Sequence, residues 1–462
     1  MMNKNKIILV PPPLLWEDKL RLSFQPPLNL LYLFSYLKAH DFDVELLDVV
    51  SLECSMEETV IRILDASPAF VGIPLYYASL DNAFALVSRL KAHNPALKFI
   101  AGGPCMTMEP DRMMREGSFD FGIIGEGEET LAALLSTRDS NASPESIPGL
   151  AFHKGDTVLI NPRRPPIINL DALPYLDFSV LNNEYYFKYQ EEVHVPRTLF
   201  LNSSRGCSFR CTYCCTPVLW PGKIRRFSPG RLVNEIIFQR ERFPGVDIGF
   251  CDDSFFSDKE WLMEFIRLIK PLQIKYQCIG RADHLTADLI RLLVESGLNY
   301  IAFGVETGSS QWQSRLKKNL DLSALVRNMR ELTKYDVKTK CFFMLGFPDE
   351  TSEDMAATIN MASTLKRNGM TFFSIFPVTV YPGTELSKQF SNQPFKIGLD
   401  AHLPEIIRDD LGISEKNAAL LNSPFNSSLT NKQMVNLVTF AYNKVEHAEI
   451  IEVDDINRVI RM

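Results

Sequence analysis

The first 145 residues alternate short apolar runs with longer amphipathic stretches. Short runs that are apolar throughout are typical of strands covered on both faces, as in a parallel sheet, and the amphipathic stretches between them are typical of helices. The pattern therefore predicts a doubly wound α/β fold with a five-stranded parallel sheet, whose ligands lie beyond the carboxyl ends of the strands. The predicted strands are Lys6–Val10, Val44–Val49, Phe70–Pro74, Lys98–Ala101 and Asp120–Ile124, and the predicted helices are Leu28–His40, Glu57–Ala66, Asp81–His93 and Pro110–Glu116.

The same alternation resumes at Thr198 and continues for about six strand–helix units. Six such units predict a partial (β/α)6 barrel, two units short of the complete eight-stranded form, with functional residues at the carboxyl ends of its strands. The predicted strands are Thr198–Asn202, Val246–Cys251, Ile274–Ile279, Tyr300–Glu306, Lys338–Leu345 and Thr371–Val380, and the helices include Arg231–Arg242, Trp261–Ile269, Ala287–Glu295, Ser323–Tyr335 and Ser352–Arg367.

These patterns divide the chain into four parts. We expect the first sheet domain at 1–145, an irregular proline-rich linker at 146–196, the partial barrel at 197–390 and a mostly helical segment at 391–462. Within the last part, Asn431–Glu449 has helical composition.

Composition narrows the function classes. The chain has 462 residues, 46% of them hydrophobic, and a net charge of −7, which gives no general attraction to nucleic acid or to an anionic membrane. No apolar run approaches the roughly eighteen residues that span a bilayer. The N-terminus does not read as a secretory signal, and nine cysteines then fit a reducing cytoplasm, where thiols serve metals more often than disulfides. We expect a cytoplasmic protein with no membrane span and no nucleic-acid partner.

Three cysteines on one short stretch carry the strongest chemical signal. Cys207, Cys211 and Cys214 follow the spacing CxxxCxxC, which can place three thiolates on the irons of one cubane cluster. Iron–sulfur clusters usually take four cysteines, so three would leave one iron open. A structural zinc site is the alternative, but zinc usually needs a second pair of ligands at standard spacing, and none is present. Cys215 points elsewhere than Cys214, and we interpret it as a buried residue in preference to a substrate-side thiol.

Loops at the predicted strand ends of the first domain are rich in glycine and tyrosine. Glycines permit tight turns or the close approach of backbone to a ligand. Each loop alone is more typical of a strand-to-helix turn, yet together they favour a large ligand across one edge of the sheet. The candidate contacts are Tyr76, Tyr77, Gly102, Gly103, Pro104, Gly125, Glu126 and Gly127.

Polar residues also end the strands of the barrel. Asp252 and Asp253 follow the second strand, where they would either bind a cationic or hydroxylated group or cap the helix after them. Arg281 ends the third strand, and its planar fork suits a carboxylate. Glu306 ends the fourth strand, and Gly304 beside it allows a ligand to approach closely.

These motifs, taken in order, resemble those of the cobalamin-binding radical S-adenosylmethionine (SAM) enzymes. The resemblance covers roughly residues 1–390 and rests on Gly-Gly-Pro, Gly-Glu-Gly-Glu, a Leu-Pro-x-x-Asp connector, CxxxCxxC, Gly-Phe-Pro-Asp-Glu-Thr and Tyr-Pro-Gly-Thr. The chain departs from the family pattern at Cys105, where histidine is common, and at Asp349, where glycine is usual. The Asp-x-His-x-x-Gly loop that supplies a cobalt ligand in mutases is absent.

The resemblance implies a function and three cofactors. The first domain would be Rossmann-like and hold cobalamin, with Tyr76 or Tyr77 below the corrin, and the three cysteines would hold a 4Fe-4S cluster whose open iron binds SAM. Tyr213 would lie near the adenine, Arg281 would bind the SAM carboxylate, and Glu306 the ribose or amino group. An electron from an external donor such as flavodoxin or ferredoxin would then yield a 5′-deoxyadenosyl radical.

Several reactions fit this set of cofactors. The leading expectation is a class B type methyltransferase that uses methylcobalamin to methylate an unactivated carbon of a small molecule or peptide. A cyclase or rearrangement enzyme without net methyl transfer is the alternative, because it would use the same loops. A methylthiotransferase is more remote, since that family has three further cluster cysteines in its N-terminal domain, where this chain has only Cys54 and Cys105.

Overall fold

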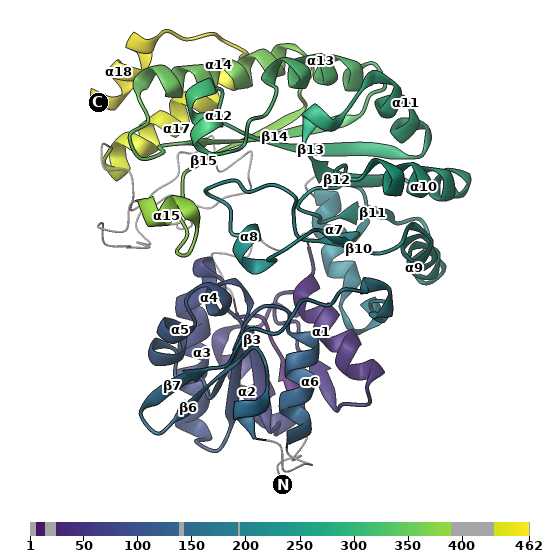
Figure 1. The fold of residues 1–462 in the computed structure, drawn as a ribbon, viewed down its shortest axis with the longest axis vertical. Coiled ribbons are helices and arrows are strands. Elements are labelled where there is room, and N and C mark those ends of the chain that lie inside the picture. Colours follow the sequence, from purple (N-terminus) through teal and green to yellow (C-terminus); the bar gives the residue numbers. More distant parts are fainter. Residues whose placement is uncertain (1–5, 14–24, 138–142, 193–194, 390–428, 462) are drawn as a thin grey trace. The chain divides into compact units, whose positions relative to one another are not determined.

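The computed structural model describes residues 6–13, 25–137, 143–192, 195–389 and 429–461 (Figure 1). It divides into two compact units. The first unit comprises Met1–Pro196 with Val218–Pro221, and the second comprises Arg197–Pro217 with Gly222–Met462. The domain limits expected from the sequence at 145, 196 and 390 stay predictions.

The first unit is built on the predicted parallel sheet. Five strands pair in parallel in the order β2-β1-β3-β4-β5, with crossovers that place helices on the sheet faces, so the doubly wound five-stranded core is confirmed. The strands are β1 (Ile7–Leu9), β2 (Val44–Leu46), β3 (Phe70–Pro74), β4 (Lys98–Gly102) and β5 (Phe121–Ile123), and the helices are α1 (Leu28–Ala39), α2 (Met56–Ala66), α3 (Leu80–His93), α4 (Gly103–Met108), α5 (Pro110–Glu116), α6 (Glu128–Ser136) and α7 (Asn183–Glu192).

Two antiparallel strands extend this sheet beyond the prediction. The segment expected to be irregular linker contains β6 (Leu150–Lys154) and β7 (Thr157–Ile160), which form a hairpin and pair β6 with β5. Gly155 and Asp156 make the two-residue turn, and Gly155 has a φ of 61°, a conformation that glycine adopts without strain. A Gly-Asp pair between two apolar runs was a usable hairpin signal in the sequence.

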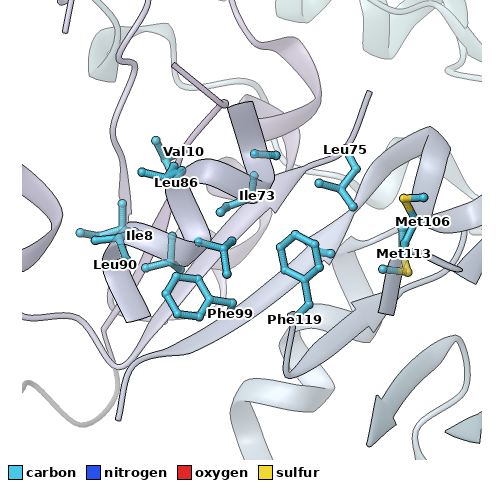
Figure 2. Close-up of a cluster of buried hydrophobic side chains, with 14 of the residues drawn as sticks. Ile8, Val10, Ile73, Leu75, Leu86, Leu90, Phe99, Met106, Met113 and Phe119 are labelled. Atoms are coloured by element: carbon cyan, nitrogen blue, oxygen red, sulfur yellow. The ribbon is translucent and has the colours of Figure 1, made fainter. Parts of the chain in front are cut away.

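One core cluster of the first unit lies between the sheet and one helical layer (Figure 2). Ile8, Ile73 and Phe99 come from three neighbouring parallel strands, and they pack against Leu86 and Leu90 of α3. Because these strands contribute apolar side chains to both faces of the sheet, their sequences show no polar alternation. This rigid core positions the loops at the carboxyl ends of β3, β4 and β5.

The C-terminal part of the predicted linker packs on the same unit. Tyr186 in α7 is 2% exposed and donates a hydrogen bond to Oδ2 of Asp48 at 2.7 Å, while the backbone N–H of Asp177 donates to Ser35 at 3.0 Å. Burial raises the pKa of Asp48, and the Tyr186 hydroxyl partly offsets that effect. The segment is therefore a packed part of the first unit.

The second unit contains the predicted six-stranded parallel sheet. Its order is β15-β14-β13-β12-β11-β8, in which each strand neighbours its predecessor in the barrel series, so the partial barrel is confirmed. The strands are β8 (Thr198–Leu201), β11 (Asp247–Phe250), β12 (Tyr276–Gly280), β13 (Leu298–Glu306), β14 (Lys338–Leu345) and β15 (Phe372–Pro377), and the helices are α8 (Thr216–Leu219), α9 (Pro229–Arg242), α10 (Lys259–Ile269), α11 (Ala287–Glu295), α12 (Ser310–Arg315), α13 (Leu322–Thr333), α14 (Ser352–Arg367), α15 (Glu385–Gln389), α17 (Asn431–Glu446) and α18 (Val453–Arg461).

Two C-terminal helices complete the outer layer of the second unit. Figure 1 shows α17 and α18, in yellow, beside α14. The hydroxyl of Tyr442 in α17 accepts a hydrogen bond from the N–H of Ile375 in β15 at 3.1 Å, and the side chain of Asn360 in α14 donates to the carbonyl of Ile451 at 3.0 Å. These helices thus pack beside the barrel, whereas residues 390–428 of the predicted C-terminal segment lie outside the described residues. No helix within the described ranges is both long enough and apolar enough to cross a membrane.

Candidate functional site

The three cysteines lie on a loop closed at its base by a small antiparallel ladder. After β8, the two-residue strand β9 (Ser204–Arg205) pairs in antiparallel fashion with β10 (Arg225–Arg226). Residues 206–224 between them form a closed loop, which contains Cys207, Cys211 and Cys214. All nine cysteines of the chain are free of disulfides. This arrangement keeps three thiols on one short segment at the carboxyl end of the first barrel strand, as the spacing predicted.

The three thiols lie within electrostatic reach of one another. Burial raises the pKa of Cys207, and the thiols of Cys214 and Cys211 raise it further. The backbone N–H of Cys214 donates to the carbonyl of Cys211 at 3.1 Å, which folds the second half of the motif into a turn. Within the described ranges no three Cys, His, Asp or Glu side chains form a preassembled metal site. The fit to a cluster therefore rests on the donor chemistry, which is three free thiols on one anchored loop.

Cys215 was expected to be buried, and the structure confirms this only in part. Burial raises the pKa of its thiol to about 12, which favours the neutral, unreactive form. Its side chain is half-buried, not fully buried, so the expectation of a fully buried residue was wrong in degree.

Backbone contacts fix the middle of the cysteine loop. Thr212 is 1% exposed; its N–H donates to the carbonyl of Leu316 at 2.9 Å, and its carbonyl accepts from the N–H of Leu386 at 2.8 Å. The residues that follow Thr212 are thereby held against the ends of α12 and α15. This orients Tyr213 toward the carboxyl end of β13.

The acidic pair after β11 does not cap the following helix, and its binding of a cationic or hydroxylated group stays a prediction. Asp252 is 2% exposed and accepts hydrogen bonds from Ser204 Oγ at 2.6 Å and Ser203 N–H at 3.2 Å, and Asp258, not Asp252, caps α10. Asp252 therefore fixes the end of β8 that leads into the cysteine loop, and burial raises its pKa to about 6. Asp253 accepts a hydrogen bond from Thr216 at 3.1 Å, just beyond the last cysteine.

A buried polar network joins the cysteine loop to the fourth barrel strand. The hydroxyl of Tyr213 donates to Oε1 of Glu306 at 2.9 Å, and Nζ of Lys318 lies 3.2 Å from the same oxygen. Burial raises the pKa of Tyr213 well above its ordinary value, so the phenol remains a donor. Glu306 has a φ of 69°, which is uncommon for a residue with a side chain and marks a position where function is to be sought.

Gly304 makes room for this network. A Cβ at residue 304 would lie 2.4 Å from Oε1 of Glu306 and 3.0 Å from Nζ of Lys318, so any other residue would displace the carboxylate or the ammonium. The sequence predicted that Gly304 allows a close approach. The structure shows that the group approaching it is the side chain of Glu306.

Arg281 lies at the predicted strand end but has intramolecular partners. Its guanidinium contacts Asp283 at 2.6 Å and 3.0 Å and donates to the carbonyl of Lys318 at 2.7 Å, and it lies 4.1 Å from the ring centre of Phe209 in the cysteine loop. These contacts position the backbone of Lys318, whose ammonium in turn contacts Glu306. Arg281 as a ligand for a carboxylate stays a prediction.

Lys318 is the residue that sequence reasoning missed. Its side chain is 9% exposed and pairs with Glu306, which offsets the cost of burying both charges. The only sequence signal was a Lys-Lys-Asn turn after a short helix, and nothing in that turn indicates which lysine faces inward. Lys317 pairs instead with Glu385 at the surface.

The loop after β14 is held by a second buried carboxylate. Glu350 is 6% exposed, and its Oε2 accepts hydrogen bonds from the N–H groups of Gly346 at 2.5 Å and Phe347 at 3.0 Å. Asp349 has a φ of 62°, which is a left-handed backbone conformation. This conformation explains why the family usually has glycine here, and aspartate tolerates it as well. Burial raises the pKa of Glu350 from 4.5 to about 8.

Glu350 predicts a pH dependence of stability. Because the folded chain binds this proton more tightly than the unfolded chain, the free energy of unfolding falls as pH rises from about 4.5 to about 8. Glu350→Gln should remove this contribution, so the variant should lose a few kcal/mol less than the wild type across that range. Chemical denaturation of the cluster-free chain at the two ends of the range measures the difference. The exposed Glu353→Gln is the matched control, and equal slopes for all three proteins would contradict the assignment.

The candidate residues at the carboxyl edge of the first sheet differ in their exposure and in their contacts. Tyr77 donates to Glu109 at 2.8 Å and packs against the core, whereas Tyr76 is 39% exposed and bonds to Asn29. Gly103 has a φ of 86°, and a Cβ there would lie 3.2 Å from the backbone of Leu75. Pro104 begins α4, and a Cβ at Gly102 would meet nothing within 4 Å. Tyr76 is therefore the exposed candidate side chain at this edge, Gly102 has open space beside it, and Cys105 is fully buried.

The Gly-Glu-Gly loop after β5 is held by internal contacts. Gly125 has a φ of 86°; its N–H donates to Thr107 at 3.0 Å, and a Cβ there would lie 2.9 Å from Nε of Arg163. Oε2 of Glu126 accepts from the N–H of Ile167 at 3.1 Å, and Gly127 precedes α6. In this loop the structure supports the tight-turn interpretation.

Arg163 also holds the segment that follows the cysteines. Its guanidinium donates to the carbonyls of Val218, at 2.7 Å, and Leu219, both of which belong to the first compact unit. Cys214 lies four residues before Val218. Val218 and Leu219 are thus held within the first unit by an arginine that also lies beside Gly125.

Two protein-family models match the chain. The Radical SAM superfamily matches residues 201–362, which include the cysteine loop and the strands β11 to β14, and the B12 binding domain matches residues 21–135. The two matches fall on different compact units and follow the order predicted from the motifs.

Curated relatives are similar along most of the chain. An uncharacterized methyltransferase of Pyrococcus horikoshii is 27% identical over 82% of this chain and 82% of its own length. The cytidylyl-2-hydroxyethylphosphonate methyltransferase of Streptomyces wedmorensis is 24% identical over 80% of this chain and 78% of its own length. The anaerobic magnesium-protoporphyrin IX monomethyl ester cyclase of Rubrivivax gelatinosus is 26% identical over 73% of this chain and 62% of its own length.

Solved structures show the same fold. The radical SAM methyltransferase TsrM from Kitasatospora setae, solved with tryptophan substrate and a SAM analog, superimposes with a TM-score of 0.70 over 87% of this chain and 79% of its own, at 15% identity. The cobalamin-dependent SAM radical enzyme OxsB gives a TM-score of 0.71 over 96% of this chain and 67% of its own, at 16% identity. The chain thus carries a B12 binding domain followed by a Radical SAM domain, in the order predicted from the motifs and with the fold of the radical SAM enzymes TsrM and OxsB, whose solved structures contain cobalamin, a 4Fe-4S cluster and SAM or its analog.

Proposed function

We propose that the chain is a methyltransferase that methylates an unactivated carbon of a small molecule or peptide. The observation that carries the proposal is the network of Tyr213, Glu306 and Lys318, because it places a carboxylate beside the cysteine loop. Both contacts of Glu306 in the described residues go to Oε1. Oε2 is then available to accept a hydrogen bond from a ligand.

The chain's own residues divide the work as follows. Cys207, Cys211 and Cys214 would hold the cluster, and Oε2 of Glu306 would accept a hydrogen bond from a hydroxyl or amino group of SAM. Tyr213 and Lys318 fix the carboxylate, and Arg281 positions Lys318. When bound, the cluster and SAM supply a carbon radical that removes hydrogen from the substrate, and cobalamin supplies the methyl group.

The corrin side of the proposal rests on the edge of the first sheet. Tyr76 is the exposed aromatic residue there, so we infer that it would contact the corrin, whereas Tyr77 is assigned to packing because its hydroxyl donates to Glu109. Gly102 lets the ligand approach the strand end, while Gly103, Pro104, Gly125, Glu126 and Gly127 set the shape of the two loops. The cluster would take its electron from an external one-electron donor such as flavodoxin or ferredoxin, and we expect the enzyme to work in the cytoplasm.

A cyclase or rearrangement enzyme is the second candidate. The similarity to the magnesium-protoporphyrin cyclase of Rubrivivax gelatinosus favours it, because that relative matches 73% of this chain. A methylthiotransferase receives less support, since the two cysteines of the first sheet domain, Cys54 and Cys105, are 4% and 0% exposed and lie in its core.

The product of SAM separates these functions. The protein is reconstituted anaerobically with iron, sulfide and hydroxocobalamin, freed of unbound corrin by gel filtration, and incubated with SAM and a strong reductant. A methyltransferase should form S-adenosylhomocysteine only when corrin is bound, because cobalamin must be remethylated in each cycle. A cyclase or rearrangement enzyme should form 5′-deoxyadenosine but no S-adenosylhomocysteine. Failure to retain corrin, or S-adenosylhomocysteine formed equally without corrin, would contradict the proposal.

A further inference from the structure

Within the described residues of the second unit, helices cover only one face of the six-stranded sheet. Helices α11, α13 and α14 lie on that face (Figure 1). Along β14 the residues Thr339, Cys341 and Phe343 are buried under these helices, and the alternate residues Lys340 and Phe342 face the opposite way and are half-buried. We call this opposite side the inner face. It is defined by Ile279, Tyr300, Lys340, Phe342, Phe372 and Phe376.

The strand register gathers these side chains into one surface. Lys340 pairs with Phe372 on β15 and with Ala302 on β13, and Ala302 pairs with Ile279 on β12. The rings of Phe342 and Phe376 stack with centroids 6.5 Å apart. The aromatic residues thus come from adjacent strands and contact one another.

Much of this surface is exposed in spite of its apolar composition. Phe372 is 48% exposed, Phe376 is 41% exposed and Ile279 is 38% exposed. Single exposed apolar residues are ordinary, but neighbouring ones on one sheet face mark a binding surface.

Lys340 is the charged residue in the middle of this apolar surface. Its Nζ lies 5.3 Å from the ring centre of Phe342, and among the described residues it has no carboxylate partner. Burial lowers the pKa of Lys340, and no neighbouring charge offsets that effect. The contrast is Lys318, which is also buried in this unit but pairs with Glu306. A partly buried ammonium without a counterion is costly unless an anion joins it.

The inner face begins beside the proposed SAM site. Phe342 pairs in register with Gly304, and the carboxylate of Glu306 lies directly over Gly304. Lys340 precedes Phe342 by two residues, and same-face neighbours along a strand are about 7 Å apart. A ligand that reaches from the Glu306 network to Lys340 would therefore cross the ring of Phe342.

We propose that the inner face is the substrate subsite of this enzyme, and that it takes a molecule with an apolar, ring-bearing body and an anionic group, such as a carboxylate or a phosphoryl group. Lys340 pairs with the anion, and Phe342, Phe372 and Phe376 contact the body. This proposal rests on the function proposed above, because it assumes that the reacting carbon lies near the SAM site. The anchor at Lys340 then fixes which carbon faces that site.

Two probes that differ only in charge test the subsite. Anaerobic titration calorimetry is performed on the protein loaded with cluster and cobalamin, using 2-naphthoate and its neutral counterpart 2-naphthamide. The wild type should bind the carboxylate about tenfold or more tightly than the amide, as expected for one charge-assisted contact. Lys340→Met keeps the apolar stem but should reduce that preference to about twofold or less, while Lys340→Arg should keep it.

Lys338→Met is the matched control. Lys338 lies on the same strand two residues earlier, but it is exposed and pairs with Asp336 at 3.2 Å, so its replacement should leave both affinities unchanged. A preference that survives Lys340→Met, a wild type that binds both probes equally, or no binding of either probe at millimolar concentration would overturn the proposal. The titration measures binding without SAM turnover. The subsite proposal can therefore be contradicted while the methyltransferase proposal stands, and the methyltransferase proposal can be contradicted while the subsite proposal stands.

Discussion

Replacing Cys211 with alanine should abolish assembly of the iron–sulfur cluster. Cys211 is the central thiol of the loop and lies within electrostatic reach of Cys214, Lys318 and Glu306. With three protein thiols and one open iron, no spare ligand can replace a missing cysteine. After anaerobic reconstitution, iron and sulfide should fall from about four per chain to background, and the cluster absorbance should disappear with them.

Cys215→Ala is the matched control for this prediction. The two variants remove the same group from the same loop, but Cys215 lies outside the CxxxCxxC spacing and we assign it no iron. It should therefore retain the wild-type iron content. Loss of the cluster in Cys215→Ala together with its retention in Cys211→Ala would show that the ligands were assigned wrongly.

Gly304→Ala should weaken SAM binding by about tenfold or more, which corresponds to about 1.4 kcal/mol. The added Cβ would lie 2.4 Å from Oε1 of Glu306, so the carboxylate must leave the position where Tyr213 and Lys318 hold it. The buried ammonium of Lys318 would then lose its counterion as well. Equilibrium binding of SAM to the reconstituted, unreduced protein measures the loss.

The control for this substitution is another glycine of the same unit. Gly230 lies in the first turn of α9, and a Cβ there would meet nothing within 4 Å. Gly230→Ala should therefore leave SAM affinity unchanged. Wild-type affinity in Gly304→Ala would mean that the Glu306 carboxylate does not bind SAM from its observed position.

The parallel sheets could be predicted because strands buried on both faces have a recognisable pattern of apolar residues. Strands such as Phe70–Pro74 are buried on both faces, so they appear as unbroken apolar runs between amphipathic helices. The strand ends that carry Cys207 and Glu306 followed from the same pattern, since the carboxyl ends of parallel strands meet at one edge. The β6–β7 hairpin was missed because its proline-rich surroundings masked a Gly-Asp turn.

The partners of the site residues could not be predicted. Arg281 was expected to bind a carboxylate, and Asp252 either to bind a ligand or to cap a helix. The sequence did not indicate the partners that the structure shows, which are groups of the chain itself 2 to 49 positions away. Lys318 was overlooked because the sequence does not show which of two adjacent lysines faces inward. In the folded chain a turn buries Lys318 and leaves Lys317 exposed. A strand-end position thus predicts where a side chain lies, whereas tertiary contacts determine what it binds.

The most direct test of the account is the formation of 5′-deoxyadenosine from SAM by the reconstituted wild-type protein. The account predicts that 5′-deoxyadenosine and methionine form when the cluster is reduced and do not form without a reductant. A protein that carries its full complement of iron and sulfide, binds SAM and yet yields no 5′-deoxyadenosine on reduction would contradict it.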